Sequence, residues 1–260
     1  MRHRGAKIVE EAQRWPRPVG STFTLLHVLN FFRFVNAPIL LQRAKDAAQA
    51  GLVRLKELAG AGWKTEVDVT LGKPRKVICK IIYKIAASSK VDLVMLGSSH
   101  RGPVSRLLLG STAHSVLRQS SCSVEIVRPP SNKKNVRTAN MKVLIATDGS
   151  KFSELALRFV VHRPWPTGSE VKIKDLNNSA LKEARTVADA GSRMLSRLEG
   201  KVSTDTPFPQ GSIAGTIVKK AEEWGAQLIV LGPHGRRKFD RLMLGSVSEH
   251  VAFHGHVRSK

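Results

Sequence analysis

One motif occurs twice in this sequence and decides the fold. The later copy reads Ala226-Gln-Leu-Ile-Val-Leu-Gly232, followed by Arg241-Leu-Met-Leu-Gly-Ser246. The earlier copy reads Val91-Asp-Leu-Val-Met-Leu-Gly97, followed by Arg106-Leu-Leu-Leu-Gly-Ser111. The copies start at residues 91 and 226, an offset of 135 that holds without a gap. Each copy reads as an apolar strand, a glycine turn, a basic loop, and Gly-Ser opening a helix. The sequence therefore predicts a duplicated α/β module.

The rest of the chain alternates short apolar strands with amphipathic helices. We expect strands at 22–28, 66–71, 92–96, 123–127, 143–147, 170–173, 202–204 and 227–231. We expect helices at 6–14, 40–58, 75–87, 111–118, 151–161, 179–198, 213–224 and 247–253, with Ser150 capping the helix that starts at Lys151. This alternation predicts two doubly wound parallel-sheet domains in tandem, whose ligands bind at the carboxyl ends of the strands.

Domain boundaries follow from a polar, proline-led stretch between the copies. Pro129-Pro-Ser-Asn-Lys-Lys-Asn-Val-Arg-Thr-Ala-Asn140 is typical of a linker. We therefore expect a first domain at 1–130, a linker at 131–140 and a second domain at 141–260.

The overall composition limits the classes of protein to which this chain can belong. With 260 residues and 42% hydrophobic content, the chain can bury two modest cores. Its apolar runs are strand-sized rather than bilayer-sized, and no apolar segment follows the basic N-terminus. Cys79 and Cys122 are too few for a disulfide framework and lack metal-type spacing. These features predict a cytoplasmic protein with no membrane partner and no secretory signal.

The net charge of +23 raises the question of a nucleic-acid partner. Residues 1–130 carry 21 Lys and Arg against 8 Asp and Glu, and residues 131–260 carry 22 against 12. The one Tyr and nine Phe form no stacking platform. Charge spread in this way favours a solvated surface, so a nucleic acid is not the expected partner.

The second copy keeps a glycine loop suited to an anion. Gly232-Pro-His-Gly235 follows a strand, and Gly245-Ser246 opens a helix ten residues later. Glycine lets backbone amides approach a phosphate without an intervening Cβ, and a helix N-terminus supplies free N–H groups and a positive dipole end. The loop lacks the Gly-Lys-Ser/Thr of a P-loop and the dinucleotide fingerprint. The alternative is that these glycines form ordinary strand-to-helix turns.

The combined pattern resembles the ATP-binding universal stress proteins. The spacing Gly-x2-Gly-x9-Gly-Ser lies in 232–246, and Asp148 closes the first strand of the module. The likeness extends through 211–225 and Ser246-Val-Ser-Glu249, and in the first half through Gly72-Lys-Pro and 120–128. It implies Rossmann-like, adenine nucleotide alpha-hydrolase-like domains of about five parallel strands. Such domains pair as homodimers or tandem pseudo-dimers.

The resemblance implies a nucleotide-binding site in the second domain and implies no catalytic residues. The nucleotide-binding residues that it implies are Asp148, Gly232, His234, Gly235, Arg236, Gly245, Ser246 and Val247. Asp148 would lie beside the nucleoside, and the glycines and Ser246 around the phosphates. The ligand implied is ATP, with or without Mg²⁺, bound as a ligand rather than as a catalytic cofactor. The alternatives are a turn or helix-capping aspartate at 148 and a solvent-facing loop residue at His234.

The two copies depart from the family pattern in different places. In the first copy, His100 stands where the second loop glycine belongs, and the strand that would carry the matching aspartate is missing ahead of the first helix. Either another segment fills that position or the chain begins late relative to its ancestor. We predict that the first copy binds no nucleotide. In the second copy no final apolar strand follows Ala252, and His250, His254 and His256 suit a helix end better than a metal.

The sequence leaves three candidate functions. The first is a stress-response protein that binds ATP or a related nucleotide in its second domain as a sensor or regulator. The second is a nucleotide-free scaffold that acts by protein association, and the third is non-specific nucleic-acid association. Hydrolysis is not expected, because the sequence shows no Walker lysine, metal carboxylate pair or oriented base, and no Gly-x-Ser-x-Gly elbow. We therefore predict a binding protein rather than an enzyme.

Overall fold

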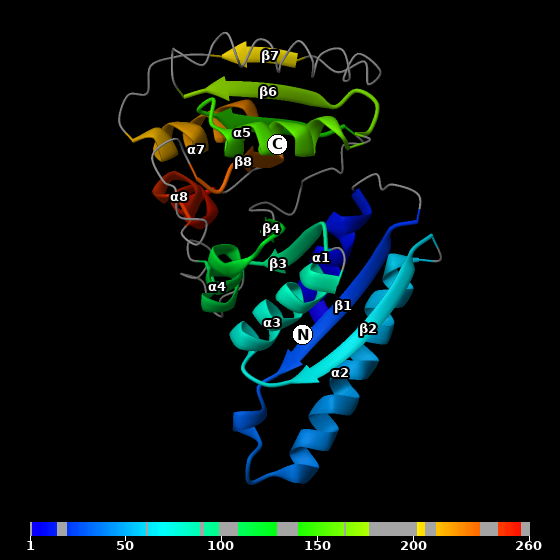
Figure 1. Cartoon of the computed structure of the whole chain (residues 1–260). Coiled ribbons are helices and arrows are strands. Elements are labelled where there is room, and N and C mark those ends of the chain that lie inside the picture. The colour runs from blue at the N-terminus through cyan, green and yellow to red at the C-terminus, as the bar shows by residue number, and fades with distance from the viewer. Residues whose placement is uncertain are drawn as a thin grey trace. The chain divides into compact units, whose positions relative to one another are not determined.

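The structure is a computed structural model, and it describes residues 2–14, 20–60, 62–88, 91–98, 109–128, 140–163, 165–176, 202–205, 212–234 and 244–255. The chain divides into two compact units, residues 1–127 and 128–260. Each unit combines parallel strands with helices (Figure 1). Among the described helices, none pairs the length with the hydropathy that crossing a bilayer requires.

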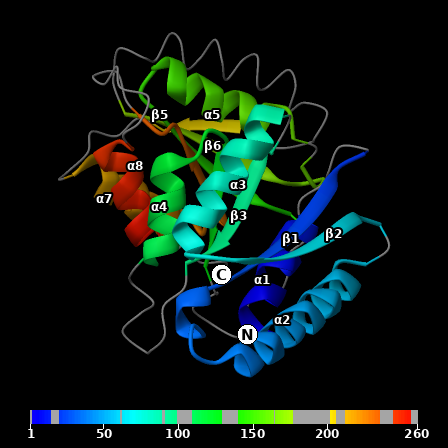
Figure 2. The ribbon, with the colours of Figure 1, turned by 60° about the horizontal axis from the view of Figure 1, so that its bottom comes forward.

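Unit 1 contains four strands and four α-helices in its described residues. They are α1 (Arg2–Arg14), β1 (Thr22–Leu29), α2 (Pro38–Ala59), β2 (Lys64–Leu71), α3 (Pro74–Ser88), β3 (Leu93–Gly97), α4 (Ser111–Gln119) and β4 (Ser123–Val127), with a 3-10 turn η1 (Phe31–Arg33) after β1. Every strand and helix predicted for this half is confirmed to within a few residues. The helices pack as α1 with α2 and α3 with α4, and Figure 2 shows these pairs on opposite sides of the strands.

Unit 2 forms one parallel sheet of four described strands in the order β7-β6-β5-β8. Its elements are β5 (Lys142–Thr147), α5 (Lys151–Val161), β6 (Glu170–Asp175), β7 (Val202–Asp205), α7 (Ile213–Trp224), β8 (Leu228–Leu231) and α8 (Ser246–His254). The helix predicted at 179–198 lies outside the described residues, as do 256–260 and the linker residues 131–139. β5 is the central strand, paired with β6 on one edge and β8 on the other.

The core of unit 2 is built around β5. Leu144 and Ala146 of this strand, Ile217 and Ala221 of α7, and Val251 of α8 form one buried cluster. An apolar run buried on both faces is typical of a central parallel strand. Burial of this cluster therefore fixes α7 and α8 on one face of the sheet.

Helix ends in unit 2 follow local sequence signals. Ser150 caps α5, as predicted, because its side chain accepts a hydrogen bond from the Ser153 N–H at 3.2 Å. Ser212 caps α7 in the same way through the Gly215 N–H at 3.0 Å. Gly225 ends α7 in the left-handed region at φ 71°, where glycine carries no Cβ penalty.

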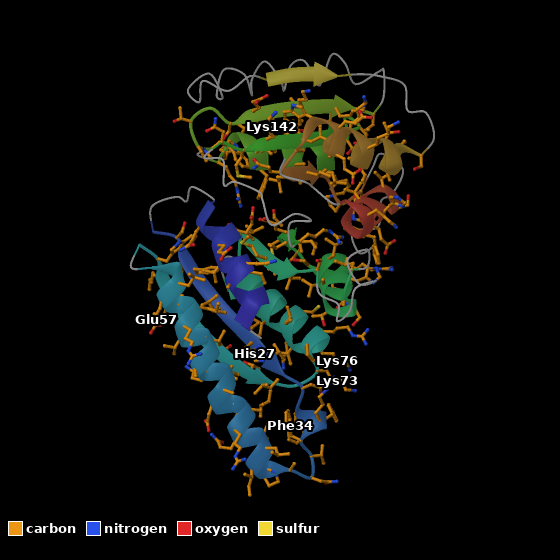
Figure 3. The ribbon with its side chains drawn as sticks, turned by 180° about the vertical axis from the view of Figure 1, so that it is seen from behind. His27, Phe34, Glu57, Lys73, Lys76 and Lys142 are labelled. Atoms are coloured by element: carbon orange, nitrogen blue, oxygen red, sulfur yellow. The ribbon has the colours of Figure 1, made fainter. Side chains whose placement is uncertain are left out.

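Unit 1 has two separate two-stranded sheets in its described residues, β1 with β2 and β3 with β4. By the sequence repeat, β3 matches β8, and by chain order β1 and β2 match β6 and β7. No described strand of unit 1 matches β5, and no described segment pairs with the second edge of β1 or of β3. His27 lies on β1 (Figure 3), and burial lowers its pKa.

Candidate functional site

The carboxyl ends of β5 and β8 are neighbours in unit 2. The two strands pair with Ala146 beside Leu231, so Asp148 and Gly232 follow immediately at the same edge of the sheet. The chain then returns to this edge, because the Gly245 N–H donates to the Pro233 carbonyl oxygen at 2.7 Å. The fold therefore brings together three predicted site residues that are far apart in the sequence.

Helix α8 begins at this edge. Gly245 precedes it with extended backbone angles of −68° and 148° and gives no side-chain cap. The first N–H groups of a helix lack intrahelical acceptors, and the dipole places partial positive charge there. Ser246 is exposed at the first helical position, whereas Val247 packs against the core, so only the backbone of Val247 is suited to a ligand. This arrangement suits an anion.

Both described loop glycines have close backbone neighbours. A Cβ on Gly232 would lie 2.7 Å from the carbonyl carbon and oxygen of Phe152 and 2.9 Å from the nitrogen of Ser153. A Cβ on Gly245 would lie 3.1 Å from the Pro233 oxygen. Gly232 is thus needed where the loop packs against α5, and Gly245 lies close to the Pro233 carbonyl of the same loop. That packing is compatible with a phosphate cradle and also with an ordinary turn.

His234 is buried rather than solvent-facing, with 8% of its surface exposed. The alternative of an exposed loop residue is therefore wrong. Its ring meets that of Phe152 edge-on, with centroids 5.1 Å apart and an interplanar angle of 76°. Among the described residues its Nδ1 atom has no hydrogen-bond partner. A buried ring nitrogen of this kind at the strand ends is a candidate contact for a polar ligand.

Asp148 shapes the turn between β5 and α5. Its Oδ1 accepts a hydrogen bond from the Ser150 N–H at 3.1 Å. Thr147 supports the same turn, since its hydroxyl accepts from the Gly149 N–H at 3.2 Å and donates to Ser153 Oγ at 2.9 Å. The turn role of Asp148 is therefore observed. Its carboxylate is half-buried at this edge of the sheet.

Two predicted residues and two overlooked ones complete the site. Gly235 and Arg236 lie outside the described residues, so their placement stays a prediction. Phe152 was missed because only the tertiary fold brings it onto His234. Ser248 was missed although it lies two residues after Ser246; its hydroxyl donates to the Gly232 carbonyl at 2.7 Å and ties α8 to the end of β8.

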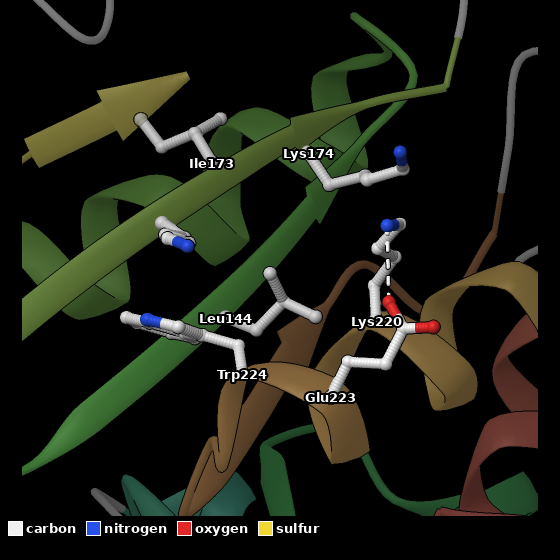
Figure 4. A pocket seen from close by; sticks show the side chains of 7 residues that line it. Leu144, Ile173, Lys174, Lys220, Glu223 and Trp224 are labelled. Carbon is white, nitrogen blue, oxygen red and sulfur yellow. Dashed lines mark ion pairs between the residues drawn. The ribbon is translucent and has the colours of Figure 1, made fainter. Parts of the chain in front are cut away.

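A separate hollow of about 260 Å³ lies against α7 (Figure 4). It is lined by Leu144, Lys172, Ile173, Lys174, Lys220, Glu223 and Trp224. Lys220 pairs with Glu223 at 3.0 Å, and the Nζ atom of Lys172 lies 4.7 Å from the Trp224 ring centroid. None of the predicted site residues lines this hollow, so it is distinct from the edge formed by Asp148 and Gly232.

A metal site is not indicated by the described residues. No group of three or more His, Cys, Asp or Glu side chains in that part of the chain could hold an ion. His250 and His254 instead stack on each other, with ring centroids 4.1 Å apart on successive turns of α8.

Comparison with known proteins identifies the family. The sequence model of the Universal stress protein family matches residues 4–128 and again residues 139–257. A universal stress protein of Mycobacterium tuberculosis strain H37Rv is 29% identical over 223 residues, which is 78% of this chain and 71% of that protein. The crystal structure of a universal stress protein from Archaeoglobus fulgidus is similar with a TM-score of 0.62, at 22% identity, and covers 95% of this chain and 86% of its own. The chain therefore belongs to the universal stress protein family and carries two of its domains in tandem.

Proposed function

We propose that unit 2 binds ATP or a related adenine nucleotide, and that the chain acts in the cytoplasm as a nucleotide-responsive regulator of a stress response. One observation carries the proposal: Asp148, the end of β8 and the N-terminus of α8 meet at the carboxyl edge of adjacent parallel strands. Open parallel sheets bind ligands at this edge. Unit 1 acts in this scheme as the supporting half of a tandem pseudo-dimer, with 131–140 as the linker.

Each residue of the edge contributes to binding rather than to turnover. The first N–H groups of α8 and the Ser246 hydroxyl donate to phosphate oxygens, and the helix dipole adds attraction. The Asp148 carboxylate accepts from the hydroxyls or the amino group of a nucleoside. His234 Nδ1 offers a further polar contact inside the fold. Arg236, next to Gly235, is proposed to neutralise phosphate charge.

Titration with a fluorescent ATP analogue tests the assignment. We expect Ser246→Ala to weaken binding by about tenfold, because one hydrogen bond to a charged oxygen is lost. Gly235→Val should weaken it further, since its side chain occupies the space of the phosphate. Ser111→Ala is the matched control, because Ser111 opens α4 as Ser246 opens α8, after glycines of nearly equal backbone angles. If neither substitution in unit 2 weakens binding, the site is wrongly assigned.

The number of sites is a separate prediction. We expect one nucleotide per chain, because unit 1 has no described strand at the position of β5 and carries His100 in place of a loop glycine. Isothermal titration measures this ratio directly. Two equivalent sites per chain would contradict the proposed division of roles.

The packing of Gly232 favours a second candidate, a nucleotide-free scaffold. Contact with the Phe152 backbone is sufficient reason for a glycine at this position without any ligand. Native purification separates the two candidates, since a nucleotide-binding protein should release an adenine nucleotide on denaturation. Protein that is free of nucleotide and does not take it up would support the scaffold.

A further inference from the structure

An exposed apolar patch lies where the chain of unit 1 turns from β1 into α2. Five large apolar side chains of this turn are between 40% and 71% exposed, namely Phe31, Phe32, Val35, Ile39 and Leu40. We call these five residues the apolar patch. Single exposed apolar side chains are normal, but a group of this size within ten residues marks a surface that contacts a partner.

The backbone of the turn is ordered by hydrogen bonds of its own. The Phe34 N–H donates to the Phe31 carbonyl oxygen at 2.9 Å, and the Ala37 N–H donates to the Phe34 carbonyl oxygen at 3.0 Å. The rings of Phe31 and Phe32 meet edge-on, with centroids 6.0 Å apart. The fold therefore holds these side chains at the surface in a defined arrangement.

Unit 2 forms the same module without such a patch. Its matching strand β6 ends at Asp175, and the sequence continues with Leu176-Asn-Asn-Ser179, which contains no aromatic side chain. The exposed side chains of the patch also bury little surface in unit 1 itself. A role in binding therefore accounts for the patch better than a role in folding.

The segments that follow β1 and β2 lie at the same edge of the sheet, because the two strands pair in parallel with Leu29 beside Leu71. Lys73, which follows β2, contacts the patch directly, since its Nζ atom lies 4.8 Å from the Phe32 ring centroid. Figure 3 shows Phe34, Lys73 and Lys76 at this end of unit 1, whereas Glu57 lies toward the other end of α2.

The charge at this end of unit 1 has one sign. Residues 20–45 and 69–88 contain no Asp or Glu. The same two segments carry six exposed basic side chains, namely Arg33, Arg43, Lys73, Arg75, Lys76 and Lys80. None of the six forms an ion pair with another residue in the part of the chain that the structure describes. The apolar patch is therefore accompanied by positive charge that no described carboxylate neutralises.

The size and charge of this surface favour a membrane over other partners. A stable protein interface takes about 20–30 residues from each side, and a second copy of this chain would bring the same net charge of +23. A nucleic acid would stack on the phenylalanines but would leave Val35, Ile39 and Leu40 exposed. A bilayer with anionic lipids uses both features, because its headgroups attract Lys and Arg and its acyl boundary accepts apolar side chains.

We propose that this end of unit 1 binds the surface of a bilayer that contains anionic lipids. The apolar patch inserts at the acyl boundary, and the six basic side chains lie at the level of the headgroups. Such contact lies in the plane of the interface and needs no helix that crosses the bilayer. It amends the expectation of no membrane partner, which rested on the absence of spanning segments. It adds to the nucleotide site proposed for unit 2 and does not depend on it.

Cosedimentation of the full chain with unilamellar vesicles, in the absence of nucleotide, tests the proposal. The anionic vesicles contain about 30% phosphatidylglycerol in phosphatidylcholine, and the control vesicles contain phosphatidylcholine alone. We expect saturable binding to the anionic vesicles and at least about tenfold weaker binding to the neutral ones. About 0.5 M salt should weaken the binding without abolishing it, because salt screens the charges and leaves the apolar contact.

A pair of variants tests the apolar contribution. Phe31→Ala with Phe32→Ala should weaken binding to the anionic vesicles by at least about tenfold, because two rings no longer insert. Val53→Ala with Leu58→Ala is the matched control. It trims two side chains that are 41% and 42% exposed and lie farther along α2, and it should leave vesicle binding unchanged.

A second pair separates local charge from the net charge of the chain. Lys73→Gln with Lys76→Gln should weaken binding to the anionic vesicles. Lys56→Gln with Lys64→Gln removes the same charge from the last turn of α2 and the first residue of β2, at the opposite edge of the same sheet. This control should bind as the unaltered chain does. Circular dichroism melting checks that all four variants keep the fold.

Three results would overturn the proposal. The first is no binding to the anionic vesicles at about 1 mM lipid. The second is equal binding of the two members of either pair, which would reduce the contact to the overall charge or to apolar adsorption alone. The third is self-association without vesicle binding that is lost in Phe31→Ala with Phe32→Ala, which would assign the patch to a second copy of the chain.

Discussion

Replacing Gly232 with alanine tests how closely the end of β8 approaches α5. The added Cβ would lie 2.7 Å from the Phe152 carbonyl group, whereas an ordinary contact begins near 3.4 Å. The first turn of α5 must therefore move by about 0.7 Å. Because the obstructing atoms are backbone, no side chain can rotate away. Overpacking of this kind costs about 1–3 kcal/mol, and at roughly 4 °C per kcal/mol it lowers the Tm of unit 2 by about 4–12 °C.

The repeat provides the matched control, Gly97→Ala in unit 1. There, among the described residues, the added Cβ meets only Ile8 Cδ1 at 3.6 Å, which is an ordinary contact. Removing a glycine from the unfolded chain stabilises by about 0.4–1 kcal/mol where the native backbone accepts alanine, so this variant should be neutral or slightly stabilising. Urea unfolding followed by hydrogen exchange assigns each change to its unit. Equal effects of the two substitutions would refute the reasoning.

Three further predictions concern single side chains. Ile217→Ala, in the fully buried core of unit 2, should cost about 2–5 kcal/mol in urea unfolding, whereas Ile213→Ala on the exposed side of the same helix should stay within about 0.5 kcal/mol. Ser212→Ala should destabilise unit 2 by about 1 kcal/mol, because the Gly215 N–H loses its cap, and circular dichroism melting measures this. Burial lowers the pKa of His27, so the unfolded state binds the proton more readily; unit 1 should lose stability as pH falls below the usual value of 6.5, and His27→Phe should remove that dependence.

The strand and helix pattern could be predicted because each element carries its own signal. The run Lys142–Thr147 is apolar on both faces and was correctly expected to be a buried parallel strand. Ser150 before an amphipathic segment correctly located the start of α5 at Lys151. Such signals are local, so they can be interpreted without knowledge of the tertiary fold.

The environment of the site residues could not be predicted in the same way. The sequence Gly-Pro-His-Gly is typical of an exposed loop, yet His234 is buried against Phe152 of α5. Nothing within several residues of His234 encodes that contact. Gly232 was likewise expected to make room for a phosphate, and the structure shows it also making room for the backbone of α5.

The different surroundings of Gly232 and Gly97 go with β5, which has no counterpart among the described strands of unit 1. β5 leads directly into α5 through the Asp148 turn and pairs with β8, so it holds the start of α5 against the end of β8. In unit 1 no described strand leads into α1, and among the described residues a Cβ on Gly97 would meet only a methyl group of Ile8. His100 also places a Cβ in the sequence position where unit 2 has Gly235.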